Sequence, residues 1–443
     1  MKKSITRQFF DYTIPTVAAM LVSGLYQVVD GIFIGRYVGA DGLAGINLAW
    51  PVIATVLGVG MMIGVGTGAL VSIKQGEKKP TLARQILASG IMVLLLVAPV
   101  VSGILYFGNE TFLGWQNGQG RVFELGQQYL EILTFASVFT LGSIAVPFLL
   151  RNDNSPNLAT LLMIVGAVLN IVLDYLFIGV WQWELRGAAL ATAISQCVVM
   201  LLGVGYFFSP LANERLGTQD LRFKLSAIPQ IFSIGLASFF MYAYGSVMVG
   251  IHNALLVKYG STVLVGAYAI LGYIVTVYYF VAEGVASGAQ PLISYQYGAK
   301  NNENVSKLLK LSMGSVVGLG IAFIVTLNLF PVELVSVFNS SDPELLAGTV
   351  TAIRLHMFAL FLDGFLVVAA AYYQAIGLGR KALFVSIGNM LVQLPFLYIM
   401  PQLFGVTGIW IAYPLSNIAL TLVVLVMMAR DAKKHRALQL QPS

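Results

Sequence analysis

Asp30 and Asp174 are carboxylic acids in segments that are otherwise apolar, and other polar residues accompany them. Asp174 lies in the run "MIVGAVLNIVLDYLFIGV", where Asn170 comes four residues earlier. Residues four apart share one face of a helix, so Asn170 and Asp174 are expected to be neighbours. An acid at the centre of a membrane helix costs about 2.5–3.5 kcal/mol on insertion scales, so each acid needs a partner or a function.

A shared depth brings the two acids together. Each lies about 17 residues into an outward-running predicted helix, or about 25 Å at 1.5 Å per residue. Thr192 lies a few residues inward from the outer end of the next helix. Two carboxylates, a carboxamide oxygen and a hydroxyl suit a hard cation such as sodium, and two close carboxylates also retain a proton because like charges repel. We predict that Asp30, Asn170, Asp174 and Thr192 form a proton or sodium coupling site; the alternative for each is a structural hydrogen bond.

The elements that carry these residues are predicted membrane helices. The 443-residue chain is 58% hydrophobic and 10% charged, with a mean hydropathy of +0.83. Twelve apolar segments are long enough to span a bilayer. They lie near residues 13–34, 43–73, 82–107, 127–150, 157–180, 186–208, 226–257, 261–296, 307–330, 350–377, 381–401 and 405–428. The sequence predicts an all-α polytopic membrane protein whose first span is too long to be a cleavable signal.

The distribution of basic residues predicts the orientation. With the amino terminus in the cytoplasm, the termini and even-numbered connections, which include Lys2, Lys3 and Arg151, carry about 20 of the 25 basic residues. The opposite connections carry acids such as Glu344 and Asp342. Both termini are therefore predicted to be cytoplasmic, which also accounts for the net charge of +6 without an acidic partner.

The chain repeats itself at a spacing of about 221 to 223 residues. "VSIKQGEKK" (Val71 to Lys79) matches "ISYQYGAKN" (Ile293 to Asn301), and "RGAALATAISQ" matches "TGIWIAYPLSN". We predict two six-helix lobes, residues 1–208 and 226–443, joined by a cytoplasmic linker, residues 209–225. Because six is an even number, both lobes enter the membrane in the same direction, and a pseudo-two-fold axis along the membrane normal should relate them around a cleft.

The repeat also serves as a control on the predicted site. An offset of 221 places Leu391 opposite Asn170, Pro395 opposite Asp174 and Tyr413 opposite Thr192. A structural device of the repeat would be expected in both lobes, so this asymmetry favours a function confined to the amino-terminal lobe.

The second lobe has its own polar residues. Glu283, Asp363, Tyr278 and Tyr372 are candidates for a substrate cleft, because acids and aromatic rings attract organic cations, although structural pairing is an equal alternative. His252, near the outer end of its helix, is expected to lie at the membrane interface. The single cysteine, Cys197, excludes an intramolecular disulfide, and the three histidines lack the spacing of a metal site.

Several segments resemble the multidrug and toxic compound extrusion (MATE) family of secondary transporters along essentially the whole chain. "VVDGIFIGRYVGADGLAGINLAWP" (Val28 to Pro51) resembles the family's first helix and following turn, and "LNIVLDYLFI" with "RGAALATAISQ" resembles its fifth and sixth helices. "EGVASGAQPLISYQYGAK" resembles its eighth helix, and "YYQAIGLGRKAL" its tenth-to-eleventh connection. The first-half acids resemble the bacterial DinF-like branch, and the eighth-helix stretch resembles MepA-like proteins.

The resemblance implies roles for particular residues. Asp30 matches the first-helix acid implicated in coupling and in helix bending, and Asn170, Asp174 and Thr192 match the rest of the amino-lobe cation site. Asp363 matches a tenth-helix acid of branches that couple sodium through the other lobe, but the seventh helix here has no acid. The implied fold is a V-shaped twelve-helix transporter that alternates between inward- and outward-open states.

The expected function is export of amphipathic, often cationic, compounds by proton or sodium antiport, from a bacterial inner membrane. We expect no enzyme activity, no cofactor beyond the coupling ion, no nucleic-acid partner and a monomer in membrane lipid. A flippase of lipid-linked saccharides is the alternative transporter. An intramembrane enzyme lacks a nucleophile with a base or a metal set, and a channel would favour rings of like groups.

Overall fold

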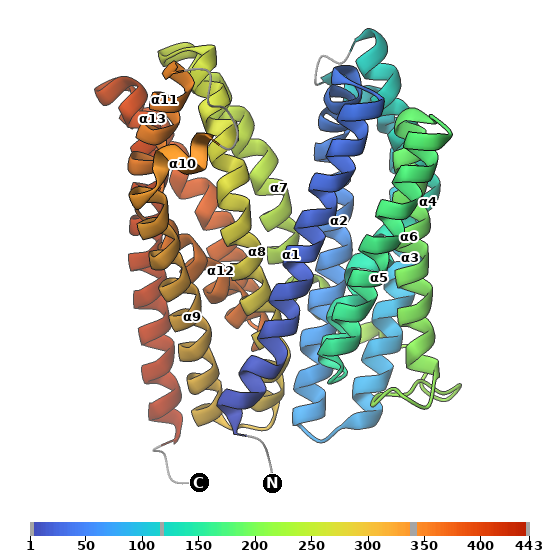
Figure 1. The fold of residues 1–443 in the computed structure, drawn as a ribbon. Helices are drawn as coiled ribbons and strands as arrows, with labels where there is room; N and C mark the ends of the chain where they lie inside the picture. The colour runs from blue at the N-terminus through green and yellow to red at the C-terminus, as the bar shows by residue number, and fades with distance from the viewer. Residues whose placement is uncertain (1–3, 116–118, 337–342, 440–443) are drawn as a thin grey trace.

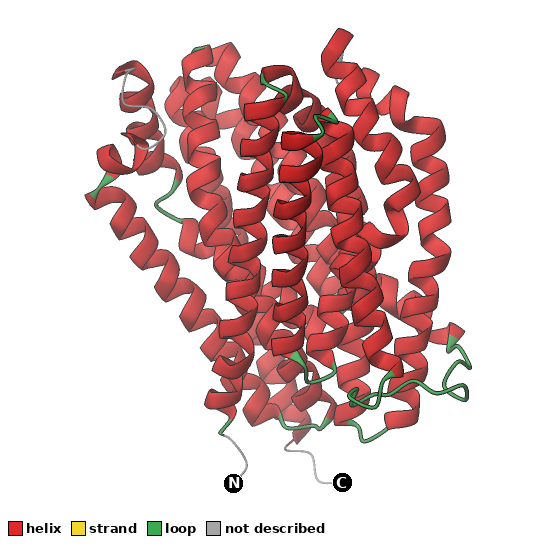
Figure 2. Ribbon diagram, turned by 45° about the vertical axis from the view of Figure 1, so that its right-hand side comes forward, coloured by secondary structure: helices red, strands yellow, loops and turns green. Residues whose placement is uncertain are grey.

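The computed structural model describes residues 4–115, 119–336 and 343–439, so Lys2, Lys3 and Asp342 lie outside the described residues. Helices form almost all of the described chain, and Figure 2 shows most of them joined by short loops, with one long loop at the lower right. The amino-terminal half contains α1 (Ile5–Tyr37), α2 (Ala40–Gly76), α3 (Pro80–Trp115), α4 (Gly120–Asn152), α5 (Pro156–Asp174) and α6 (Glu184–Phe208). The carboxyl-terminal half contains α7 (Ile228–Tyr259), α8 (Thr262–Gly298), α9 (Asn302–Leu329), α10 (Pro331–Ser336), α11 (Pro343–His356), α12 (Leu360–Ala375) and α13 (Gly379–Gln439).

The helices account for the twelve predicted spans, with one difference. Ten helices in the described ranges are long and apolar enough to span a membrane, and α11 with α12, which bend by 53° at their junction, pass the same test of length and composition only as a pair. The sequence predicts that bent pair as one continuous helix. The helix α13 is two helices joined at Gly405, whose φ of 57° no ordinary residue adopts easily. Its 55-residue apolar part would be about 80 Å long if straight, enough for two spans.

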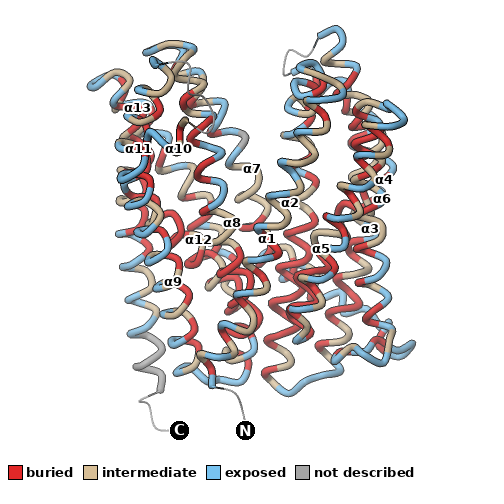
Figure 3. Tube along the Cα trace, viewed as in Figure 1, coloured by how far each residue is buried: buried red, intermediate tan, exposed pale blue. Residues whose placement is uncertain are grey.

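Two lobes are visible in Figure 1, α1–α6 on the right and α7–α13 on the left. They lean apart at one end and meet toward the other, where α1 begins and α13 ends. Buried segments gather inside each lobe and along the half where the lobes meet (Figure 3). The predicted two-lobe, V-shaped fold is therefore confirmed.

Glycine backbones form the contact between the lobes, and their contacts are reciprocal. A Cβ on Gly76 of α2 would strike the Tyr295 carbonyl oxygen of α8, and a Cβ on Gly298 of α8 would strike the Ile73 carbonyl oxygen of α2. Gly298 lies 222 residues after Gly76, and Tyr295 lies 222 residues after Ile73, so the two contacts are made by equivalent positions of the two lobes. Such an exchange of equivalent contacts is the mark of a two-fold axis between repeats.

The helix α1 packs against both lobes. Its inner half lies against α8, where Gly284 and Gly288 leave room for only the backbones of Val17 and Thr13. It also lies along α5, where the Thr160 hydroxyl lies 3.0 Å from the Pro15 carbonyl oxygen and donates to it. Because α1 touches both lobes, a change in its outer half can reach the boundary between them.

The predicted linker is fastened to the amino-terminal lobe. The Asp153 carboxylate accepts main-chain hydrogen bonds from Asn213 (2.9 Å) and Glu214 (2.7 Å). The Arg84 side chain donates to Asp220 at 3.0 Å, and the Lys224 N–H donates to the Ser89 hydroxyl at 2.7 Å. Residues 209–224 are thus positioned to move with the amino-terminal lobe.

Arg151 is placed differently from the sequence prediction. It was expected in a cytoplasmic connection, but it lies in the last turn of α4 and has no exposed surface. The reason is geometric: side chains of an α-helix lean toward its amino-terminal end, so an arginine at the inner end of α4 extends back into the protein.

Candidate coupling site and inter-lobe cavity

Asp30, Asn170, Asp174 and Thr192 lie together inside the amino-terminal lobe. The carboxyl groups of Asp30 on α1 and Asp174 on α5 form a hydrogen bond with each other. With the Asn170 amide oriented to satisfy both neighbours, its nitrogen donates to Asp174 Oδ2 at 3.2 Å and its oxygen accepts from Thr192 Oγ1 at 3.3 Å. The predicted meeting of three helices is therefore present in the geometry, whereas the role of the four residues stays a prediction.

The oxygens of this cluster have unused capacity for a cation or proton. Asp30 Oδ1 and Asp174 Oδ1 are buried and have no hydrogen-bond partner among the described residues. A hydrogen bond between two carboxyl groups needs a proton on one of them, so the contact between Asp30 and Asp174 is itself a place where a proton can be held. Two carboxylates, an amide oxygen and a hydroxyl are ligands that suit a proton or a small hard cation.

Two local features position the cluster. The helix α5 ends at Asp174 and continues as a π-helical turn, Tyr175–Val180, a form that often accompanies functional sites. On the other side, the Tyr129 hydroxyl of α4 hydrogen-bonds with Thr192. Sequence reasoning missed Tyr129, because a tyrosine in an apolar helix carries no signal of what its hydroxyl meets.

The carboxyl-terminal lobe contains a polar cluster of its own. Asp363 on α12 is 1% exposed, and Asn389 Nδ2 of α13 donates to its Oδ1 at 3.1 Å. One turn further along α13, Gln393 accepts a hydrogen bond of 2.5 Å from Tyr244 of α7. Asn389 and Gln393 have the spacing of Asn170 and Asp174, but at an offset of 219 residues.

The 221-residue comparison therefore pairs the buried Asn170 with an exposed residue in this helix. Leu391, which it places opposite Asn170, is 53% exposed. Breaks between helices change the offset by a few residues along the chain, so a single spacing misaligns some faces. The second lobe therefore has a polar cluster at this helix, built from Asn389, Gln393 and Asp363.

His252 was expected at the membrane interface, but it is 1% exposed. Its ring stacks on Tyr268 at 4.8 Å and meets His356 edge-on at 5.6 Å, while Nδ1 lies 2.8 Å from the Met248 carbonyl oxygen. This part of the outer carboxyl-terminal lobe is a packed aromatic core.

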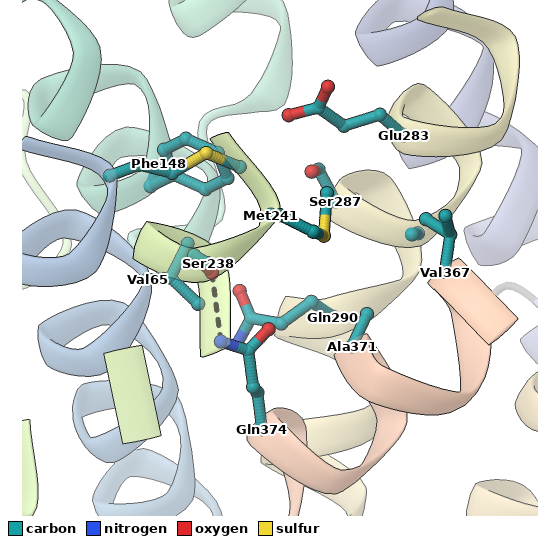
Figure 4. Close-up of a pocket in the computed structure, with 12 residues that line it drawn as sticks. Val65, Phe148, Ser238, Met241, Glu283, Ser287, Gln290, Val367, Ala371 and Gln374 are labelled. Atoms are coloured by element: carbon teal, nitrogen blue, oxygen red, sulfur yellow. Dashed lines mark hydrogen bonds between the residues drawn. The ribbon is translucent and has the colours of Figure 1, made fainter. Parts of the chain in front are cut away.

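A small cavity lies between the lobes, and Glu283 is the acid on its wall. The cavity, about 30 Å³, is bordered by Met61, Phe148, Met241, Glu283, Gln290 and Gln374 among others. Figure 4 shows the Glu283 carboxylate at one end, directed toward Phe148, and Gln290 and Gln374 at the other. The volume admits one or two water molecules, so a larger guest requires the methionines to repack, which their flexible thioethers allow.

The other three predicted cleft residues lie elsewhere. Tyr278 is 2% exposed and its hydroxyl donates to the Val316 carbonyl oxygen, so it belongs to the core of its lobe. Asp363 is buried in the cluster described above. Tyr372 packs against Tyr373 near the carboxyl-terminal end of α12 and is not part of the cavity wall.

A two-lobe bundle of this kind, with paired acids inside the membrane and a cavity between the repeats, defines a polytopic membrane transporter. Similarity to known proteins identifies the family of this transporter. A family model described as MatE matches residues 15–176 and 234–399, once in each lobe, so the chain belongs to the MatE family, whose members are transporters.

Relatives and solved structures agree over the full length. The chain is 25% identical over 432 residues to the "Multidrug export protein MepA" of Staphylococcus saprophyticus, covering 97% of this chain and 95% of that protein. It is 25% identical over 447 residues to the same-named protein of Staphylococcus aureus strain MSSA476, with 97% and 95% coverage. Among structures, it resembles the MATE multidrug transporter DinF-BH, solved in complex with a dye, with a TM-score of 0.89, 28% identity and 97% coverage of each chain. A MATE protein in complex with MaL6 shares the fold with a TM-score of 0.92 at 22% identity, with 98% coverage of each.

Proposed function

We propose that this protein exports amphipathic organic cations across a bacterial inner membrane by antiport against protons or sodium ions. The observation that most directly supports cation coupling is the contact between the Asp30 and Asp174 carboxyl groups, each with one buried oxygen that lacks a partner among the described residues. Its relatives named multidrug export protein and the dye complex of DinF-BH support the class of substrate.

The orientation follows from the same proposal. Basic residues favour cytoplasmic termini. The lobes lean apart at the opposite end, so the conformation is outward-facing (Figure 1). In this state the acid pair can receive a cation from outside.

Cation binding changes the charge of the pair, and α1 links that change to the lobe boundary. Asp30 is on the outer half of α1, while the inner half of α1 packs against the glycines of α8. Coupling requires that the cation and the substrate prefer different conformations, so that binding of one disfavours the other. A change of charge on a helix shared by both lobes meets that requirement.

The test is efflux of ethidium from proteoliposomes, with a sodium gradient and a pH gradient imposed separately. Wild type should respond to one gradient, and Asp30→Asn should lose that response while folding normally. Asp41→Asn is the matched control, because Asp41 is an exposed acid in the first turn of α2. Gradient-driven efflux that persists in Asp30→Asn would refute the coupling site. If wild type fails under both gradients, the antiport proposal falls and flipping of lipid-linked saccharides becomes the next assay.

A further inference from the structure

Arg151 is a buried cation with incomplete hydrogen bonding. It has no exposed surface, and its Nε and Nη1 atoms have no partner among the described residues. Its Nη2 atom lies 3.3 Å from the Met163 sulfur, a weak acceptor, and its guanidinium lies 5.1 Å from the centre of the Phe148 ring. Keeping a charged donor buried with unused N–H groups is unfavourable, so its presence requires a reason.

Glu283 is the acid whose charge acts on Arg151, although the two do not form an ion pair. Each of the two side chains interacts electrostatically with the charge of the other. No described ion pair joins them, and Glu283 has no hydrogen bond to another described residue. Arg151 also lies close to the cavity wall, since its guanidinium contacts the ring of Phe148, which borders the cavity together with Glu283.

The two charges belong to different lobes, so their separation depends on the conformation. Arg151 is on α4 and Glu283 on α8. Next to Arg151, the Asn152 amide exchanges hydrogen bonds of 3.0 and 3.3 Å with Gln290 of α8, which holds the inner ends of these helices together. Opening the inner side must break that pair and move the α4 arginine away from the α8 acid.

We propose that Arg151 is a built-in release group: in the outward-facing state its charge lowers the affinity of the Glu283 cavity for an organic cation. Inward opening separates α4 from α8, removes the competing charge and lets Glu283 bind the cation from the cytoplasm. The inference rests on the proposed export of organic cations. It adds that the carboxyl-terminal lobe supplies the anion that binds the substrate and the amino-terminal lobe supplies the cation that expels it.

The substrate class follows from the wall of the cavity. One carboxylate among methionine, valine and phenylalanine side chains suits a single positive charge on a largely apolar body, and the other polar side chains of the lining, Ser238, Ser287, Gln290 and Gln374, are neutral. A second positive charge on the substrate would meet Arg151 without a second acid to compensate it. Monocations should therefore bind more tightly than dications of similar shape.

The test is a double-mutant cycle on ethidium binding to the purified full-length protein in lipid nanodiscs, read by fluorescence anisotropy. Glu283→Gln should weaken binding about tenfold. Arg151→Met should strengthen it about tenfold and slow ethidium efflux from proteoliposomes, because release becomes harder. In the Glu283→Gln background, Arg151→Met should have no effect on affinity.

Two controls keep the result interpretable. Arg186→Met removes an arginine from the same lobe whose side chain is 60% exposed, and should leave ethidium affinity unchanged. Arg151→Gln repeats the measurement with a polar neutral side chain if Arg151→Met does not fold. Unchanged or weaker binding in the folded Arg151 variant, or the same tightening with and without Glu283, would overturn the inference. Such a result in a protein that still exports ethidium leaves the proposed function standing, whereas absent gradient-driven efflux in wild type overturns the proposed function.

Discussion

Replacing Gln290 by methionine should shift the protein away from the conformation that we propose to be outward-facing. Gln290 Nε2 donates to Asn152 Oδ1 at 3.3 Å, and Asn152 Nδ2 donates to Gln290 Oε1 at 3.0 Å, across the boundary between the lobes. Each neutral hydrogen bond contributes about 0.5–1.5 kcal/mol net, so the pair contributes about 1–3 kcal/mol to this conformation. Losing it should change the ratio of outward to inward states by about 5- to 150-fold.

The assay is the distance between spin labels at the outer ends of the lobes, measured by pulsed electron paramagnetic resonance. Labels at Phe107→Cys and Val257→Cys, in a Cys197→Ser background, use positions that are 85% and 56% exposed. Gln290→Met should increase the population with the shorter distance.

Gln374→Met is the matched control for that experiment. Gln374 Nε2 donates to the Ile234 carbonyl oxygen and the Ser238 hydroxyl, both at 2.8 Å, and these partners belong to its own lobe. Its loss should reduce stability without changing the distances. The reasoning would be refuted by an unchanged distribution in Gln290→Met, or by an equal shift in Gln374→Met.

Two further predictions concern the linker and the boundary between the lobes. Burial raises the pKa of the Asp220 carboxyl, but the Gly217 N–H and Arg84 outweigh it and hold that pKa below its ordinary value. The stabilisation by Asp220 is therefore complete at a pH above the ordinary carboxyl pKa and is lost as the pH falls through the lowered pKa. Asp220→Asn should lower the free energy of unfolding by about 1–2 kcal/mol at pH 7, and the difference from wild type should vanish in acid. Thermal unfolding in detergent measures both. Gly298→Leu should abolish ethidium efflux at normal expression because its Cβ would strike the Ile73 carbonyl group, whereas Gly314→Leu, with open space around the glycine, should transport normally; efflux by Gly298→Leu would contradict the close contact.

The sequence predicts the fold well because each membrane helix can be recognised from its own stretch of apolar residues. Apolar length identifies each span, and the repeat identifies the two lobes without knowledge of any long-range contact. The depth of Asp30 and Asp174 on parallel-running helices also predicts that they meet. What joins them, a carboxyl–carboxyl hydrogen bond flanked by Asn170, is a property of helix rotation that depth alone does not fix.

The errors of sequence reasoning come from rotation and from helix breaks. Asn389 and Gln393 were overlooked because they lie 219 residues after Asn170 and Asp174, whereas the offset used for the comparison was 221. Arg151 and Tyr278 were misplaced because hydropathy does not reveal whether a polar side chain points into the protein. The sequence repeat thus predicts which helices of the two lobes correspond, but it does not predict which side chains point into the protein.

The glycine contacts between α2 and α8 also affect how easily the lobes can move. Where side chains interdigitate, one helix can rotate against another only by lifting each ridge out of its groove. At Gly76 and Gly298 the surfaces in contact are main chain, without side chains to interlock. The boundary is smooth at its tightest points, so these contacts offer little steric resistance to rotation of α2 against α8.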